Sequence, residues 1–211
     1  MRPIYLFSIS THPDAININS LDITFLQPKI DFSSYDFLIL TSKQASKALQ
    51  HYDLQEYIHL PALAISKESA KSYEAIGGTI LNVGDGYGDT LSDKIKQYAK
   101  TKRWLYLRAE IVASDFVARC REEGYLIDEA IVYRSACSEA IKKALIAKDA
   151  ILIFTSPSSL KCFLKNHSFS QENKIIVIGK TTAQALPQGI DFFMSEKRTV
   201  QSCVALAKTL F

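Results

Sequence analysis

The sequence predicts an α/β protein with two similar domains, each a parallel sheet flanked by helices, and three observations indicate this fold class. Short apolar runs alternate with amphipathic helical segments, which is typical of parallel strands joined by crossover helices. The second half of the chain resembles the first at a separation of roughly 110 residues, a period that suits duplicated domains and is too long for a solenoid. Hydroxyl-rich turns follow the apolar runs, where crossover helices would begin.

Both halves show one order of elements: strand, hydroxyl-rich turn, helix, strand, turn, helix, short strand and helix. The matching segments are "LILTS" at 38–42 with "LIFTS" at 152–156, "ALAISKESA" at 62–70 with "IIVIGKTTA" at 175–183, "AIGGTILNV" at 75–83 with "LPQGIDFFM" at 186–194, and "GDTLSDKIKQYA" at 88–99 with "KRTVQSCVALAKTL" at 197–210. Each pair predicts the same element twice.

Two further segments lie outside this repeat. Residues 103–136 predict a strand, a helix that ends with Gly124 in the C′ position, and a strand through Val132 and Tyr133. The first 30 residues offer the strands "IYLFSIS" and "LDITFLQPKI" without a long helix between them.

Composition limits the kind of partner. The 211 residues are 47% hydrophobic and 22% charged, an ordinary globular composition that is large enough for one big domain or two small ones. The formal charge of +3 does not favour binding to a nucleic-acid backbone, although it suits an anionic small ligand.

The four cysteines, Cys120, Cys137, Cys162 and Cys203, lie far apart and form no C-x-x-C pair. We expect them to be buried free thiols, which fits a reducing cytosol. No signal peptide and no membrane span are expected, because the amino terminus turns polar quickly and the longest apolar run, "AILIF", is short.

The hydroxyl residues after the strands have two interpretations, both open. As helix caps they need no ligand: Ser156 with Pro157 fits an N-cap followed by N1, and Thr41 with Gln44 has capping-box spacing, as does Thr181 with Gln184. Helix N-termini also meet at the carboxyl edge of a parallel sheet, where their N–H groups favour carboxylates or phosphates. Two such edges could enclose a polyanionic ligand.

Other motifs fail. "GKT" at 179–181 lacks the earlier glycine of a phosphate-binding loop, and "GDGYGD" at 84–89 carries aspartates that would repel a pyrophosphate. His12, His51, His59 and His167 show no metal-ligand spacing, and no G-x-S-x-G motif is present. We therefore expect neither a metal site nor a catalytic triad.

Four segments, "FLILTSKQASKAL", "AIVYRS", "ILIFTSPSSLKCFL" and "VIGKTTAQAL", in this order and at these separations, resemble the uroporphyrinogen-III synthase family. The resemblance covers 35–211 and implies two α/β domains, joined by a two-stranded β linker, with a cleft between them. Residues 1–26 and 136–211 would form the first domain, 32–130 the second, and 27–31 and 131–135 the linker strands.

The resemblance also implies the activity. The family takes the linear tetrapyrrole hydroxymethylbilane, removes water, and closes the ring with inversion of the terminal pyrrole through a spiro intermediate, using neither metal nor organic cofactor. Its substrate carries eight carboxylates, a ligand suited to helix N-termini. The implied protein is a cytoplasmic, monomeric hydro-lyase of heme and porphyrin biosynthesis, with no nucleic-acid or membrane partner.

Residue by residue, the resemblance makes Tyr133 in "VYR" the proton donor to the departing hydroxyl; the competing interpretation is a tyrosine that simply fills a strand. Arg108 is expected to contact a carboxylate, although Ala109 stands where the family often has glycine. The other expected substrate-binding residues are Thr41, Ser42, Ser66, Lys67, Thr155, Ser156, Ser158, Lys180, Thr181 and Thr182. Ser66 replaces a usual glycine, and either lysine could instead be solvated.

Two other classes of protein are alternatives to an enzyme. A two-lobed binding or sensor protein for an anionic metabolite would use the same helix N-termini and would leave its ligand unchanged. A nucleic-acid binder is less favoured, because no basic run interleaved with aromatics is visible.

Overall fold

The structure is a computed structural model that describes residues 2–112 and 114–210. The chain forms two compact units, Met1–Asp22 with Ala136–Phe211 and Ile23–Ser135. The predicted domain division, in which 27–31 and 131–135 are separate linkers, stays a prediction.

The unit Ile23–Ser135 is built on a six-stranded sheet with the strand order β3-β8-β7-β4-β5-β6. Its strands are β3 (Leu21–Phe25), β4 (Phe37–Leu40), β5 (Ala62–Ala64), β6 (Ile80–Val83), β7 (Arg103–Ala109) and β8 (Leu126–Cys137). The chain runs parallel in the neighbouring pairs from β8 to β6. The carboxyl ends of these strands therefore meet at one edge.

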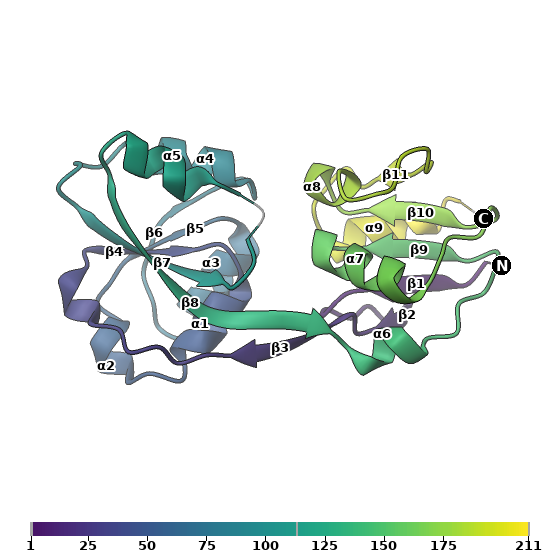
Figure 1. Cartoon of the computed structure of the whole chain (residues 1–211), viewed down its shortest axis with the longest axis horizontal. Coiled ribbons are helices and arrows are strands. Elements are labelled where there is room, and N and C mark those ends of the chain that lie inside the picture. The colour runs from purple at the N-terminus through teal and green to yellow at the C-terminus, as the bar shows by residue number, and fades with distance from the viewer. Residues whose placement is uncertain (1, 113, 211) are drawn as a thin grey trace. The chain divides into compact units, whose positions relative to one another are not determined.

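Helices cover both faces of this sheet (Figure 1). On one side lie α1 (Lys43–Leu49), α2 (Leu54–Tyr57) and α3 (Lys67–Glu74), and on the other α4 (Gly88–Ile95) and α5 (Phe116–Glu122); a short 3-10 helix spans Phe32–Ser34. Alternate residues of β4 divide between the two cores: Leu38 and Leu40 face the first, and Ile39 faces the second. A strand buried on both faces needs the uninterrupted apolar run that predicted it.

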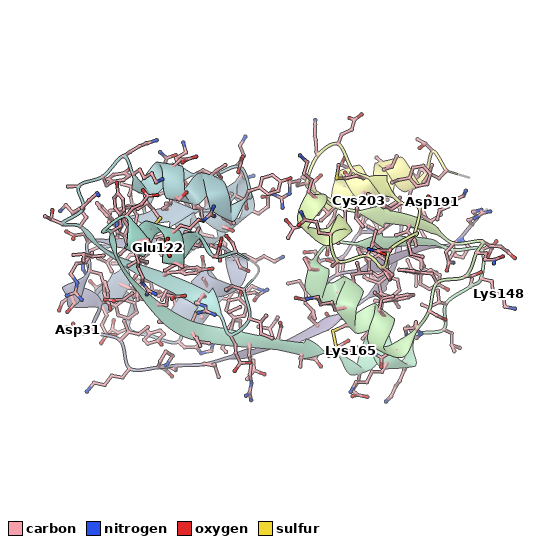
Figure 2. The ribbon with its side chains drawn as sticks, turned by 45° about the horizontal axis from the view of Figure 1, so that its top comes forward. Asp31, Glu122, Lys148, Lys165, Asp191 and Cys203 are labelled. Carbon is pink, nitrogen blue, oxygen red and sulfur yellow. A yellow bond between two sulfur atoms is a disulfide. The ribbon has the colours of Figure 1, made fainter. Side chains whose placement is uncertain are left out.

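The second unit holds a five-stranded parallel sheet with the order β11-β10-β9-β1-β2. Its strands are β1 (Ile4–Phe7), β2 (Ile16–Ile18), β9 (Ile151–Phe154), β10 (Lys174–Val177) and β11 (Phe193–Met194). Helices α6 (Glu139–Lys143), α7 (Pro157–Asn166) and α8 (Lys180–Ala183) pack on one face, and α9 (Val200–Ala207) on the other. Figure 2 labels Cys203 on α9 and Lys165 on α7.

The predicted fold class, α/β with parallel sheets flanked by helices, is confirmed. The element orders β4-α1-α2-β5-α3-β6-α4 and β9-α7-β10-α8-β11-α9 follow the internal repeat, apart from the extra helix α2. Gly124 ends the helix before β8 with φ +88°, a backbone conformation that glycine tolerates and other residues avoid.

Two details of the strands differ from the expectation. No strand is expected from the sequence at Ile16–Ile18, where the structure has the three-residue strand β2. Residues 27–31, expected to be a linker strand, lie outside any strand, and the neighbouring strand is β3 at Leu21–Phe25. Pro28 has no N–H to donate to a sheet ladder, which disfavours a strand through 27–31.

The expectation of four free thiols is wrong for two of them. Cys137 and Cys162 form a disulfide with a Cα–Cα distance of 5.3 Å, drawn as a yellow bond beside the Lys165 label in Figure 2. The two residues are 25 positions apart, and only the packing of α7 beside the end of β8 brings them together. Cys120 and Cys203 are buried and free, as predicted.

Candidate active site

The turn after β4 places two consecutive hydroxyls at the carboxyl edge of the six-stranded sheet. Ser42 has extended backbone angles and is the N-cap of α1, where its side chain accepts a hydrogen bond of 3.1 Å from the Gln44 N–H. Thr41, which the spacing to Gln44 predicted as the cap, lies one residue too early. Its Oγ1 is instead 2.9 Å from the hydroxyl of Tyr106 on β7.

Tyr133 lies on β8, in the core that α1 covers, and only 8% of it is exposed. Burial raises the pKa of Tyr133 above its ordinary value of 10.0, and the nearby Ser42 hydroxyl opposes that rise in part. The phenol is therefore protonated at neutral pH, as a proton donor must be.

The next turn of the same edge follows β5. Ser66 is the N-cap of α3, and its side chain accepts a hydrogen bond of 3.3 Å from the Ser69 N–H. Lys67 is the exposed first residue of that helix. Ser66 thus caps the helix whether or not a ligand binds.

Arg108 forms an ion pair and hydrogen bonds within the protein. Its guanidinium lies 2.8 Å from Glu129 and also donates to the carbonyl oxygens of Ala109 and Glu110 at 3.0 Å each. Glu129 holds a second guanidinium, that of Arg121, at 2.9 Å. A substrate carboxylate at Arg108 would therefore compete with Glu129.

In the other unit, the turn after β9 carries three of the predicted residues. Ser156 is the N-cap of α7 with Pro157 in the first turn, as predicted, and it accepts a hydrogen bond of 3.1 Å from the Ser159 N–H. Thr155 Oγ1 donates at 2.9 Å to Ser8 Oγ, at the end of the neighbouring strand β1. Ser158 is exposed.

The turn after β10 departs from the prediction. The N-cap of α8 is Gly179, which has no side chain to cap with, so the predicted capping pair of Thr181 and Gln184 is wrong. The helix begins at Lys180, one residue before Thr181, and this places Thr181 inside it. Thr182 is 2% exposed, so its side chain is not presented to a ligand, whereas Lys180 is exposed.

The predicted residues thus gather on two sheet edges, one in each unit. Thr41, Ser42, Ser66, Lys67, Arg108 and Tyr133 belong to the unit Ile23–Ser135, and Thr155, Ser156, Ser158, Lys180, Thr181 and Thr182 belong to the other.

Comparison with known proteins decides the family. A family model described as "Uroporphyrinogen-III synthase HemD" matches residues 13–205, which is most of the chain. The chain belongs to the uroporphyrinogen-III synthase family. Its activity is that of a hydro-lyase of tetrapyrrole biosynthesis, which cyclises hydroxymethylbilane to uroporphyrinogen III with loss of water. Nothing in the comparisons favours the alternative of a sensor protein.

Solved structures of uroporphyrinogen-III synthases resemble the whole chain. A crystal structure of the synthetase from Helicobacter pylori matches with a TM-score of 0.84 and 25% identity, over 100% of both chains. A mutant synthase from Thermus thermophilus matches with a TM-score of 0.65 and 14% identity, over 99% of this chain and 98% of that one, and shows the fold alone. No curated protein matches the chain.

Within the described residues, no group of three or more His, Cys, Asp or Glu side chains could hold a metal ion. Over the same residues, no helix is both long and apolar enough to cross a membrane.

Two polar residues beside the turns at these sheet edges were not predicted from the sequence. Tyr106 sits in the apolar run "RWLYLRA", which signals only a buried strand. Arg198 packs over the turn before α8, where a side chain at Gly179 would meet its Nε at 3.0 Å. Both are distant in sequence from the turns that they contact, so no local spacing reveals them.

Proposed function

We propose that this synthase binds hydroxymethylbilane through the carboxyl edges of its two sheets and that Tyr133 protonates the departing hydroxyl. The observation that carries the proposal is the buried phenol of Tyr133 beside the hydroxyl of Ser42, the N-cap of α1. Ser42 uses its oxygen to accept from the Gln44 N–H. Its own proton can then be given to the phenol oxygen, which leaves the phenol proton for the substrate.

One tyrosine can give the proton that the reaction needs and regain it at the end. The pyrrole nitrogen assists departure of the hydroxyl, which takes the proton of Tyr133 and leaves as water. The resulting azafulvene cation is attacked by the substituted carbon of the terminal ring, and a spiro intermediate forms. Reopening and closure at the free carbon invert the ring and release one proton, which restores the phenol. Positioning of the chain therefore carries more of the catalysis than acid strength.

Substrate carboxylates are the proposed ligands of the helix N-termini. Both α3 and α7 have at least eight residues, and their N-termini favour anions through unpaired N–H groups and the helix dipole. Lys67 and Lys180 are exposed at the starts of α3 and α8, where an ammonium group can meet a carboxylate. The remaining proposed contacts are the hydroxyls of Thr41, Ser66, Thr155, Ser156, Ser158 and Thr181.

The proposal keeps two properties implied by the family resemblance, a monomeric state and a cytoplasmic location. Buried free thiols at Cys120 and Cys203 support a reducing compartment. The bond between Cys137 and Cys162 does not, and in a reducing cytosol we expect that pair to be present as two thiols.

The isomer of the product tests the proposal. Purified protein is mixed with freshly made hydroxymethylbilane, and the oxidised porphyrins are separated by chromatography against a heat-denatured control. We expect uroporphyrinogen III, formed faster than the spontaneous type I isomer. A product mixture equal to that of the denatured control would overturn the proposal.

A further inference from the structure

Thr41 and Tyr106 form a hydrogen-bonded pair across two neighbouring strands. Their oxygen atoms are 2.9 Å apart, and β4 and β7 lie side by side with Leu40 opposite Leu107. Tyr106 lies in the core with Ile39, the face of the sheet opposite to that of Tyr133. The two tyrosines next to the turn at Thr41 and Ser42 therefore lie on opposite faces of the sheet.

Either oxygen could donate in the bond between Thr41 and Tyr106, and burial favours the phenol as the donor. Tyr106 is 3% exposed, and its ring packs 5.2 Å from that of Phe116. Burial raises its pKa to about 12, so the phenol keeps its proton at all physiological pH values. A buried O–H needs an acceptor, and among the described residues the partner of this phenol is Thr41 Oγ1.

A threonine hydroxyl has one proton and can also accept. If Tyr106 donates to Thr41, the proton of Thr41 is not used in this bond, and it is available to an acceptor at the sheet edge. Thr41 is partly exposed there, next to the first residues of α1. A threonine hydroxyl that accepts from Tyr106 keeps its one proton for a ligand that accepts, such as a carboxylate.

We propose that Tyr106 is a positioning residue of the synthase, which by donating to Thr41 turns the threonine hydroxyl into a donor for a carboxylate of the linear tetrapyrrole. The inference rests on the proposed function, because it assumes that the substrate reaches the edge that carries Thr41. It adds a residue that touches no substrate and that acts through Thr41.

A structural role alone makes a different prediction. The Tyr106 ring fills an apolar core that includes Trp104 and Phe116, and Tyr106→Phe keeps that ring. The change removes only the hydroxyl, so a purely structural residue would show altered stability without a change in the KM for hydroxymethylbilane. A positioning residue would show a raised KM that depends on Thr41.

The experiment is a double-mutant cycle with Tyr106→Phe and Thr41→Val, read as KM and kcat with hydroxymethylbilane. We expect each single variant to raise KM about threefold to tenfold, the value of one neutral hydrogen bond, with kcat nearly unchanged. The double variant should be no worse than Thr41→Val alone, and Thr41→Ser should keep most of the wild-type KM.

Tyr125→Phe is the matched control. Tyr125 is buried in the same core as Tyr106, but it precedes β8 at the opposite edge of the sheet, with its hydroxyl 3.5 Å from the Lys96 carbonyl oxygen. The KM of Tyr125→Phe for hydroxymethylbilane should equal that of the wild type.

Two results would overturn the inference: a wild-type KM in Tyr106→Phe, or KM effects of the two changes that multiply. If Tyr106→Phe does not fold, a wild-type KM in Thr41→Val overturns it as well. Failure of the proposed function differs from all of these, because then the wild-type protein itself makes no excess of the type III isomer.

Discussion

Cys137, the last residue of β8, is bonded through its sulfur to Cys162 on α7. A second contact ties the same helix to the residue before β3, because Ser20 Oγ donates to Ser159 Oγ at 2.7 Å. The start of β3 and the end of β8 are therefore both fastened to α7, whose N-terminus carries Ser156. The disulfide and the Ser20–Ser159 hydrogen bond thus both involve the helix that Ser156 caps.

Reduction of this disulfide should lower the stability of the protein. The bond closes a segment in which the cysteines are 25 residues apart, and a loop of that size restricts the unfolded chain by about 3.5 kcal/mol. We expect dithiothreitol to lower the urea midpoint of wild-type protein. A Cys137→Ser, Cys162→Ser variant should start at the lower midpoint and ignore the reductant.

Cys203→Ser is the control for that measurement, because Cys203 is a buried free thiol in the other core of the same unit. Its urea midpoint should still fall on reduction. A wild-type midpoint that does not change with dithiothreitol would contradict the prediction.

Removing the Tyr133 hydroxyl should slow turnover while the fold is kept. Tyr133→Phe leaves the ring in the core and removes the proton donor, so we expect kcat to fall by about tenfold. This loss is smaller than the roughly 10²–10⁴-fold that is typical of acid catalysis, because the pyrrole nitrogen assists departure of the hydroxyl. Stopped assays of substrate consumption give kcat, and the melting temperature reports the fold.

Ser42→Ala provides a graded comparison for Tyr133→Phe. It removes the hydroxyl beside the phenol and with it the N-cap of α1, so it should lower kcat less and cost about 1 kcal/mol of stability. Unchanged kcat in Tyr133→Phe would leave Tyr133 as a tyrosine that fills a strand.

The helix starts, helix ends and strands could be predicted because neighbouring residues in the sequence identify them. Ser156 with Pro157 identifies a helix start by itself, because a cap and its N1 residue are neighbours. Gly124 likewise marks the end of a helix through its own backbone conformation. The apolar runs identify strands for the same reason, and the repeat of these signals gives the order of elements.

Features that depend on the approach of distant segments could not be predicted. Thr41 and Ser42 both suit capping, and only the backbone shows that Ser42 caps while Thr41 meets Tyr106. The pairing of Cys137 with Cys162 depends on where α7 packs. The family resemblance could point to Arg108, but it carried no information on Glu129.

Neutralising Glu129 should strengthen substrate binding if Arg108 contacts a carboxylate. Glu129 holds Arg108 at 2.8 Å, with both side chains mostly buried, and competes with any substrate anion there. We expect Glu129→Gln to lower the KM for hydroxymethylbilane about threefold, within the range of one partly exposed ion pair. Adding Arg108→Ala should abolish the gain.

Asp128→Asn is the matched control for Glu129→Gln. It removes the same charge from the adjacent residue of β8, whose ion pair is with Arg103 at 3.1 Å. Its KM should stay at the wild-type value. An equal fall of KM in both variants would mean that net charge, and not release of Arg108, sets the affinity.

Alkaline pH should destabilise the unit Ile23–Ser135 through its buried tyrosines. Burial raises the pKa of Tyr106 to about 12 from 10.0, and it raises the pKa of Tyr73 as well. The unfolded chain then loses its phenol protons first, so the stability that these groups contribute is complete below pH 10 and is lost as pH rises toward 12. For Tyr106 the loss amounts to about 3 kcal/mol. Urea midpoints measured from pH 8 to 11.5 should fall above pH 10. They should fall less in Tyr106→Phe, because this variant has no phenol to ionise at position 106. Identical pH profiles for the two proteins would show that Tyr106 titrates as an ordinary tyrosine.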